Sequence, residues 1–369
     1  MASHFRKLIV EDIRQETADC VSIAFTVPPT LEEEFRFRQG QTITIRTRIG
    51  EEELRRSYSI CSSPLEKELR IAVKKVAGGR FSSFANGQLR KGDELEVLPP
   101  TGRFYTELDK EQSKNYVAFA AGSGITPILS LIKTTLALEP DSHFTLIYGN
   151  RYRPSIIFRE ALEDLKNRYM HRLSIHHILS REKMDSPLNQ GRIDAEKCRE
   201  LNGRLIHPAT TDEFFLCGPA EMIFTVRDWL EKEGVGKNKI HFELFTTQDG
   251  TATGFTGTGD KTRTDAGKTM SSHPGKTSKV TVRLDGVSLD FELAYEGESV
   301  LDAALLQGAD LPFACKGGVC CTCRARLMEG KVEMDVNYAL EEEELAAGFI
   351  LTCQSHPRTE KVVIDFDSK

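Results

Sequence analysis

The chain has little of what marks membrane, secreted or nucleic-acid-binding proteins. Its first residues contain no long apolar stretch, so a secretory signal is not expected. The uncharged run Tyr116–Ile132 is interrupted by Gly122, Gly124 and Pro127, so a phosphate-binding turn explains it better than a membrane helix, and no membrane partner is expected. The net charge of −6 disfavours a nucleic-acid partner. The nine cysteines lack disulfide-framework spacing, which predicts a reducing, cytoplasmic location.

Four of the cysteines have an informative spacing. Cys315, Cys320 and Cys323 form a C-x4-C-x2-C pattern, and Cys353 follows in a remote segment. This spacing is typical of a plant-type [2Fe–2S] cluster, in which one curled loop supplies three thiolates and a remote segment supplies the fourth. Two glycines after Cys315 permit the curl and let backbone N–H groups approach the sulfurs. Zinc is the alternative, but zinc sites usually present two short Cys or Cys/His pairs. The spacing therefore favours an iron–sulfur centre, with Cys321 pointing away from it.

Charge is distributed unevenly along the chain. Residues 279–369 contain nine Lys and Arg against 17 Asp and Glu, a net charge of −8, so residues 1–278 carry +2. An acidic C-terminal domain suggests transient, electrostatic docking on a basic partner surface. The run Glu341–Glu344 within it is more simply interpreted as a solvated helix face.

Composition and hydrophobic periodicity divide the chain into four segments. Residues 1–108 contain short strands separated by turn signals, which predict an antiparallel barrel or sandwich. Residues 109–245 alternate apolar strands with helical stretches, which predict a parallel α/β sheet. Residues 246–278 are dominated by Gly, Thr, Ser, Asp and Lys, and predict a flexible linker, with an ordered insertion as the alternative. Residues 279–369 predict a small mixed sheet with one helix near Val300–Gln307.

Two runs in the first segment predict a site for a ligand with a pyrophosphate and an aromatic ring. In Arg56-Ser57-Tyr58-Ser59, strand alternation puts Arg56 and Tyr58 on one face, and Ser59 can donate a hydrogen bond to a ring nitrogen. Alone, this run is an ordinary exposed strand. It gains weight from Gly78–Ser83, a glycine turn into a predicted helix whose N–H groups can receive a phosphate.

Two further turns stand at the ends of strands in the second segment. The run Gly122–Pro127 follows a strand and opens a helix, so its amides should point at a second pyrophosphate. It lacks the third glycine of the G-x-G-x-x-G fingerprint. The run Cys217-Gly218-Pro219 ends a later strand, where open α/β sheets bind ligands, although Cys217 alone is more often a buried core thiol.

Together these motifs resemble, in their order, the ferredoxin–NADP reductase superfamily fused to a plant-type ferredoxin. The runs Ala309–Cys320 and Asn337–Gly348 are similar to those of the reductase components of bacterial phenylacetyl-CoA epoxidases. The resemblance implies a β-barrel FAD domain, an α/β NAD(P)H domain and a small α+β (β-grasp) ferredoxin domain. It implies electron transfer from NADPH through FAD and [2Fe–2S] to an oxygenase component, here the epoxidase of aerobic phenylacetate catabolism. A Rieske-type or other hydroxylase is the second candidate acceptor, and a non-redox zinc-binding module is a distant alternative.

The resemblance also implies the residues of each site. The FAD residues are expected to be Arg56, Ser57, Tyr58, Ser59, Val73, Lys74, Gly79, Phe81, Ser82, Thr126 and Phe245. The nucleotide residues are expected to be Gly122, Gly124, Thr126, Pro127, Asn150, Arg151, Ser180, Arg181, Cys217, Gly218 and Pro219. The catalytic residues are expected to be Ser59, Cys217 and Glu243, and the cluster ligands Cys315, Cys320, Cys323 and Cys353.

A preference for NADPH is expected from two arginines. Arg151 follows one strand, and Arg181 follows another in a Ser-Arg-Glu run that resembles the 2′-phosphate site of plant-type reductases. Guanidinium groups suit phosphate dianions. Either arginine alone is more often a surface charge, so the prediction depends on the pair.

Overall fold

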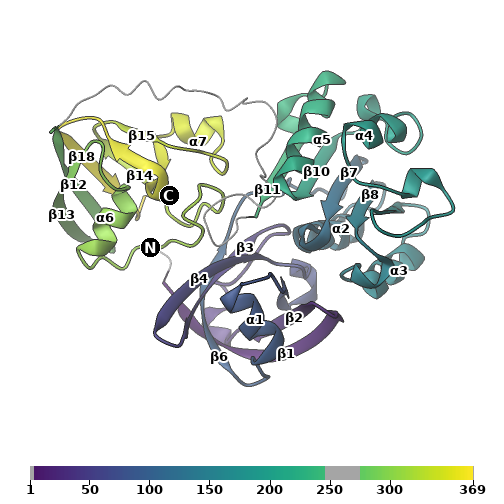
Figure 1. Ribbon diagram of the computed structural model, residues 1–369, viewed down its shortest axis with the longest axis horizontal. Coiled ribbons are helices and arrows are strands. Elements are labelled where there is room, and N and C mark those ends of the chain that lie inside the picture. Colours follow the sequence, from purple (N-terminus) through teal and green to yellow (C-terminus); the bar gives the residue numbers. More distant parts are fainter. Residues whose placement is uncertain (1–3, 246–274, 369) are drawn as a thin grey trace. The chain divides into compact units, whose positions relative to one another are not determined.

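The computed structural model describes residues 4–245 and 275–368, which fall into two compact units (Figure 1). Residues 5–245 form the first, called here the flavin–nucleotide unit, and residues 275–368 make up most of the second, the cluster unit. The segment expected to be a linker lies outside the described residues except for its last four. Of these, Ser278 is fully buried and pairs with Leu293, so the sheet of the cluster unit begins slightly earlier than expected.

The flavin–nucleotide unit begins with an antiparallel barrel, as predicted. Its strand order is β4-β3-β6-β1-β2-β5, and an isolated bridge between Ile60 and Ile71 joins the two edges. Ile43 and Ile45 are fully buried, as β-branched residues on the inner face of a pleated strand should be. The elements are β1 (Arg6–Thr17), β2 (Cys20–Thr26), β3 (Thr42–Ile49), β4 (Glu52–Ser59), β5 (Leu69–Lys74), α1 (Arg80–Gly87) and β6 (Glu94–Thr101).

The second half of this unit is a parallel sheet with helices packed against it (Figure 1). Its order is β11-β10-β7-β8-β9. Successive strands are therefore added on one side of β7 as far as β9 and on the other side from β10 onward, so the strand order reverses between β7 and β10. Ligands of open α/β sheets bind at the carboxyl ends of the strands beside such a reversal. The elements are β7 (Asn115–Ala121), α2 (Ile125–Leu138), β8 (His143–Asn150), α3 (Arg159–Arg168), β9 (Leu173–Leu179), α4 (Ala195–Leu201), β10 (Glu213–Gly218), α5 (Ala220–Lys232) and β11 (Ile240–Leu244).

The cluster unit is a mixed sheet of order β13-β12-β18-β14-β16, in which only the β12–β18 pair is parallel, beside a two-stranded sheet of β15 and β17. The helix expected near Val300–Gln307 is present as α6. The elements are β12 (Thr277–Leu284), β13 (Val287–Ala294), α6 (Val300–Leu306), β14 (Arg324–Glu329), β15 (Val332–Met334), α7 (Glu342–Ala346), β16 (Phe349–Leu351), β17 (Ser355–Pro357) and β18 (Lys361–Asp365).

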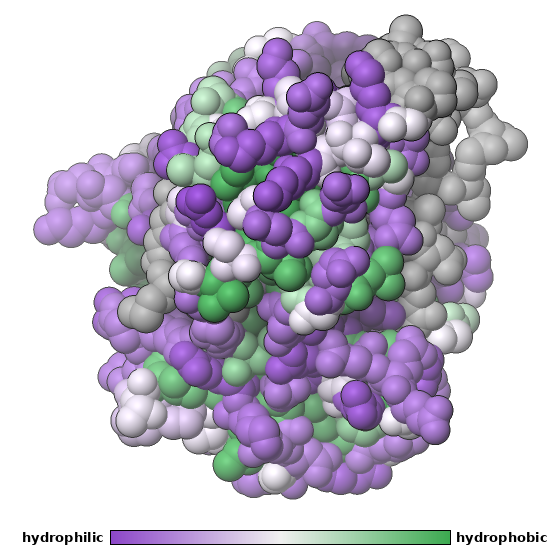
Figure 2. Space-filling model, turned by 90° about the vertical axis from the view of Figure 1, so that its left-hand side faces the viewer, coloured by the Kyte–Doolittle hydropathy of each residue, from purple (hydrophilic) through white to green (hydrophobic). Residues whose placement is uncertain are grey.

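The surface is mixed in polarity. On the face drawn in Figure 2, hydrophilic residues surround smaller hydrophobic areas. Across the described ranges, no helix combines the length and the apolar character needed to cross a membrane.

Candidate functional site

Strand β4 ends beside the helix that follows the glycine turn. The ring of Tyr58 lies 5.4 Å from that of Phe81 in α1, centroid to centroid, so the two runs expected to bind one ligand are neighbours. Ser57 points elsewhere, because its Oγ lies 2.9 Å from Oγ1 of Thr44. An Nη1–H of Arg56 donates to its neighbour's carbonyl at 2.7 Å. The structure therefore packs Tyr58 against the buried ring of Phe81 and directs Ser57 toward β3.

The glycine turn before α1 is held by Ser82. Its Oγ donates to the carbonyl of Gly79 at 3.2 Å and accepts from the N–H of Val76 at 3.1 Å. A Cβ on Gly79 would come within 2.3 Å of that Oγ and 3.0 Å of the Val76 carbonyl oxygen, so a larger residue would displace the Ser82 hydroxyl. Val73 is fully buried, and its carbonyl accepts from Asn86 of α1 at 3.0 Å. The Ser82 hydroxyl is therefore engaged with the backbone of the turn.

Ser59, Cys217 and Glu243 converge from three strands. Ser59 Oγ donates to Glu243 Oε2 at 2.6 Å, across 184 positions of the sequence. Cys217 of β10 and Glu243 of β11 face each other in the parallel register. Surrounding protein desolvates Glu243 and raises its pKa to about 7, against the opposing effect of the Ser59 hydrogen bond. Burial, together with the nearby Glu243 carboxyl, raises the pKa of the fully buried Cys217 thiol well above its usual value.

The loop after β7 lies against the end of β10. A Cβ on Gly124 would come within 2.1 Å of the Cys217 carbonyl oxygen, so glycine is required for this approach. The carbonyl of Gly122 accepts from the Tyr148 hydroxyl at 3.0 Å, and Thr126 Oγ1 donates to the carbonyl of Ser123 at 3.0 Å. Tyr148 was not predicted as a site residue, because it is an ordinary strand residue in the local pattern.

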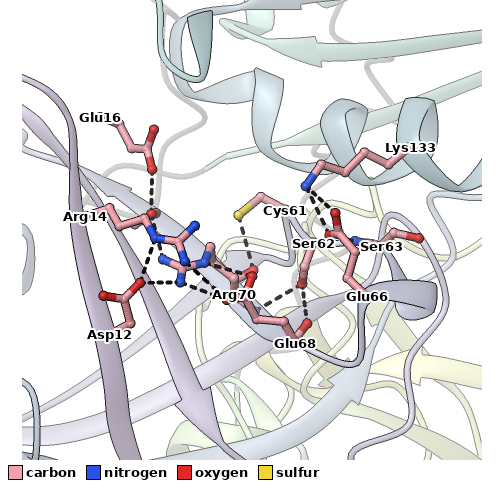
Figure 3. A network of polar contacts seen from close by, with 11 residues as sticks. Asp12, Arg14, Glu16, Cys61, Ser62, Ser63, Glu66, Glu68, Arg70 and Lys133 are labelled. Atoms are coloured by element: carbon pink, nitrogen blue, oxygen red, sulfur yellow. Dashed lines mark hydrogen bonds and ion pairs between the residues drawn. The ribbon is translucent and has the colours of Figure 1, made fainter. Parts of the chain in front are cut away.

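Helix α2, which begins at this loop, is attached to the barrel by the segment that follows Ser59 (Figure 3). Ser130 Oγ donates to the carbonyl of Ser62 at 2.6 Å, and Lys133 Nζ binds Glu66 at 2.9 Å. The segment itself is tied to β5, where Arg70 is 5% exposed. The segment that directly follows Ser59 thus joins the barrel to the helix that begins at the loop after β7. These contacts had no recognisable sequence pattern.

The arginine pair lies at the carboxyl ends of β8 and β9. The N–H of Arg181 donates to the carbonyl of Arg151 at 3.0 Å, and the N–H of Ser180 donates to that of Asn150 at 2.9 Å. In the parts of the chain that the structure describes, neither guanidinium forms an ion pair. Residues from two separate turns are therefore brought together at the edge where open sheets bind nucleotides.

The four predicted cluster ligands form two thiol pairs in the cluster unit. Cys315 neighbours Cys320, and Cys323 neighbours Cys353; within each pair the interaction between the two thiols raises the pKa of Cys315 and Cys323 and lowers that of Cys320 and Cys353. Among the described residues, no three His, Cys, Asp or Glu side chains are arranged around a single metal ion. Two pairs of thiols suit a centre with two irons, each of which takes two protein sulfurs.

The non-ligand residues of the loop are held in place by the rest of the unit. Cys321 has a φ of +53°, and its thiol donates to the carbonyl of Ala339 at 3.1 Å.

One expectation was wrong: the run Glu341–Glu344 is not wholly solvated. Glu344 is 3% exposed and forms an ion pair with Arg324, the residue after Cys323, because the first turn of α7 rotates it inward.

Family models match each part of the chain. The oxidoreductase FAD-binding domain matches residues 7–105, the oxidoreductase NAD-binding domain matches 119–228, and the 2Fe-2S iron-sulfur cluster binding domain matches 282–358. The last match favours iron–sulfur over zinc at the cysteine loop.

Relatives match this chain over nearly its whole length. The chain is 47% identical to a component protein of the 1,2-phenylacetyl-CoA epoxidase of Escherichia coli (strain K12), covering 99% of this chain and 98% of that protein. It is 32% identical to the ferredoxin reductase component of 3-ketosteroid-9-alpha-monooxygenase of Rhodococcus rhodochrous, covering 97% and 96%. Its fold matches the structure of phthalate dioxygenase reductase with a TM-score of 0.56, 23% identity and 98% coverage of both chains.

Proposed function

Because this chain belongs to the family of FAD- and [2Fe–2S]-containing reductase components of multicomponent oxygenases, we propose that it supplies electrons from NADPH to a phenylacetyl-CoA epoxidase. The observation that carries this choice of acceptor is the 47% identity to a component of such an epoxidase over nearly the whole of both chains. We propose that the residues expected at the FAD, nucleotide, catalytic and cluster sites serve at those sites. Since no disulfide joins the described cysteines, we propose a reducing cytoplasm as the location.

In this proposal the protein holds the cofactors in place and controls a proton at Glu243. When bound, FAD accepts two electrons from the nicotinamide and the cluster passes them on one at a time. Ser59 and Glu243 lie where β4 meets β11, and a carboxyl whose pKa is about 7 can hold or release a proton at neutral pH. Ionised Glu243 orients the Ser59 hydroxyl through the 2.6 Å hydrogen bond. The close packing of Gly124 on Cys217 keeps the nucleotide loop beside these two residues.

The proposed preference for NADPH depends on Arg151 and Arg181. Their backbones are joined by a 3.0 Å hydrogen bond, so both side chains start from the same edge of the sheet. A phosphate dianion bound by two guanidiniums gains charge-assisted hydrogen bonds that a ribose hydroxyl cannot supply. We expect Arg151→Ala/Arg181→Ala to lower kcat/KM for NADPH by about 100-fold while changing that for NADH little, since two such hydrogen bonds are worth roughly 3 kcal/mol. Equal wild-type values for the two nucleotides would contradict the proposal.

The partner would dock on the acidic cluster unit. Its sequence from residue 279 onward has a net charge of −8. Exposed large hydrophobic residues also lie on it, including Leu345 in α7 beside the acidic residues Glu342 and Glu343. An acidic surface with scattered apolar contacts suits a small, transient redox interface, in which charge mainly sets the encounter rate.

The second candidate acceptor is a Rieske-type or other hydroxylase. Another acceptor than the epoxidase is favoured by the 32% identity to the reductase of a 3-ketosteroid monooxygenase. The test is to mix the full chain, NADPH and each purified oxygenase with its own substrate. Coupled product formation should be fastest with phenylacetyl-CoA epoxidase and phenylacetyl-CoA. A higher coupled rate with a Rieske-type hydroxylase would assign the chain to that acceptor instead.

A further inference from the structure

The turn that carries the fourth cysteine is attached to both ends of the ligand loop. This turn is the short 3-10 helix Thr352–Gln354. On one side of Cys353, Thr352 donates to the carbonyl of Cys323 through its Oγ1 at 2.9 Å and its N–H at 3.2 Å. On the other side, Gln354 Nε2 donates to the carbonyl of Lys316 at 2.9 Å. The two neighbours of Cys353 therefore hold the end and the start of the loop that carries the other three cysteines.

Unlike Thr352, Gln354 also contacts the sulfur of Cys353. Its Nε2 lies 3.0 Å from the carbonyl oxygen of Cys353 and 3.5 Å from the Cys353 Sγ. The carbonyls of Lys316 and Cys353 can only accept, so the nitrogen end of the amide must face them and the sulfur. Gln354 is 8% exposed, and a buried amide is costly unless it is hydrogen-bonded. The two hydrogens of this Nε2 serve three acceptors, so the sulfur shares one of them with a carbonyl. The side chain is thus a buried donor within reach of one ligand sulfur.

Packing keeps the Gln354 side chain in this position. A Cβ on Gly318 would lie 3.3 Å from Gln354 Cγ and 3.0 Å from the carbonyl oxygen of Val336. Gly318 has a φ of +73°, so a side chain there would also be strained. The main-chain carbonyl of Gln354 accepts from the N–H of Asp335 at 2.9 Å, which fixes the backbone from which the side chain starts. The side chain therefore lies against Gly318 of the ligand loop, and its backbone is anchored to the segment before α7.

We propose that Gln354 is a positioning residue that raises the reduction potential of the cluster by donating a hydrogen bond to the Cys353 sulfur. Reduction adds one electron, and hence one negative charge, to a cluster held by thiolates. A donor at a thiolate stabilises the more negative state, and hydrogen bonds to the sulfurs are known to tune such potentials. The inference rests on the proposed function in one respect, namely that these four cysteines hold a [2Fe–2S] cluster.

The test is to measure the midpoint potential of the cluster in the full chain carrying Gln354→Met. Methionine has a similar length and no donor, so it fills the space and removes only the hydrogen bonds. Loss of this donor disfavours the reduced cluster, because that state carries more negative charge on its sulfurs. The equilibrium constant for reduction should therefore fall about tenfold, which is about 59 mV toward more negative potential for one electron. Gln354→Glu should shift the potential in the same direction and further, because it also adds a negative charge.

Two control variants separate the hydrogen bond to sulfur from the attachment of the loop. Thr352 is fully buried, and Thr352→Val removes the side-chain bond to Cys323 while leaving every donor at sulfur in place. It should weaken cluster retention and leave the potential near the wild-type value. Gln307 is an exposed glutamine at the C-terminal end of α6, and Gln307→Met should change neither property.

The outcomes distinguish this inference from the proposed function. Wild-type protein that binds no iron and sulfide would contradict the proposed function itself. An unchanged potential in Gln354→Met with full iron content would overturn the inference and leave the proposed function standing. An equal shift in Thr352→Val would also overturn it, because the attachment of the loop would then be the cause. If Gln354→Met loses iron, the EPR signal of the remaining clusters reports their potential, and the same comparison applies.

Discussion

The two units place their candidate functional groups in opposite ways. In the cluster unit, three of the four thiols lie between Cys315 and Cys323, and the fourth is on a turn bonded to that same loop. In the flavin–nucleotide unit, Ser59 and Glu243 meet across 184 positions. A cluster needs a closely spaced set of sulfurs, which a short loop can supply. Flavin and nucleotide are long ligands, so their residues must come from the ends of many strands. The first site is therefore encoded locally and the second by the fold.

The sharpest test of this difference is to remove one cluster ligand. Changing Cys315, Cys320, Cys323 or Cys353 to Ser should abolish or alter the cluster, because their spacing in a matched 2Fe-2S domain makes each an expected ligand. FAD should remain bound, since it occupies the other unit. Iron content, the cluster absorption bands and flavin content measured on the same sample check both statements. Loss of FAD in such a variant would show that the two sites do not assemble independently.

The matched control for these variants is Cys321, which lies between two ligands. Its thiol donates to the carbonyl of Ala339 and its φ is +53°, so it is directed away from the two thiol pairs. Cys321→Ala should keep the spectrum of the cluster, at a modest cost in stability from the lost hydrogen bond. A missing cluster in Cys321→Ala would mean that the ligand set is wrong.

The next largest effect is expected on separating the units. A fragment that ends near residue 247 contains both sheets and both cores of the flavin–nucleotide unit. It should bind FAD and reduce artificial two-electron acceptors with NADPH, and it should fail to drive the oxygenase because the one-electron carrier is absent. Flavin content and the two activities are the measurements. An insoluble or flavin-free fragment would argue that the remaining residues are required for folding.

This contrast also explains what could be predicted from the sequence. Cysteine spacing identified the cluster loop, and strand and helix periodicity identified the barrel and the parallel sheet, because these are local signals. The attachment of α2 through Ser130 and Lys133, and the hydrogen bond from Tyr148 to Gly122, depend on which strand ends meet in space. No local pattern records such contacts. For the same reason the burial of Glu344 was missed: four consecutive glutamates do not show which one the first turn of a helix directs inward.

A smaller effect is expected from the carboxyl that joins the barrel to the parallel sheet. Glu243→Gln keeps the shape and removes the titration, so reduction of FAD by NADPH should slow by about 100-fold if this carboxyl handles a proton. The measurement is the rate of flavin bleaching in a stopped-flow instrument as a function of pH. A variant with the wild-type rate and pH profile would assign Glu243 to structure alone.

The same group should affect stability in a defined pH window. Its folded pKa of about 7 lies above the usual value of 4.5, so the folded state binds the proton more tightly. The stabilisation is fully present below pH 4.5 and is lost as pH rises to about 7, by up to about 3 kcal/mol. Denaturant unfolding at pH 5 and pH 8 should show this loss in the wild type and a smaller one in Glu243→Gln. Equal losses in the two proteins would place the pH dependence on other groups.

The smallest effect concerns charge, where the units differ most. Because residues 279–369 carry −8 and the rest of the chain +2, encounter with a basic oxygenase surface should be electrostatically assisted. Raising the ionic strength from about 0.01 M to 0.15 M shortens the screening length from about 30 Å to 8 Å, so the oxygenase-coupled rate should fall severalfold at limiting oxygenase.

Reduction of FAD by NADPH is measured over the same salt series, since binding of an anionic nucleotide is itself salt-sensitive. Reversing one exposed charge, Glu342→Lys, should reduce the salt dependence of the coupled rate without affecting flavin reduction. If the coupled rate stayed flat while flavin reduction also stayed flat, the acidic surface would serve solvation, and the charge difference between the two units would carry no information about the partner.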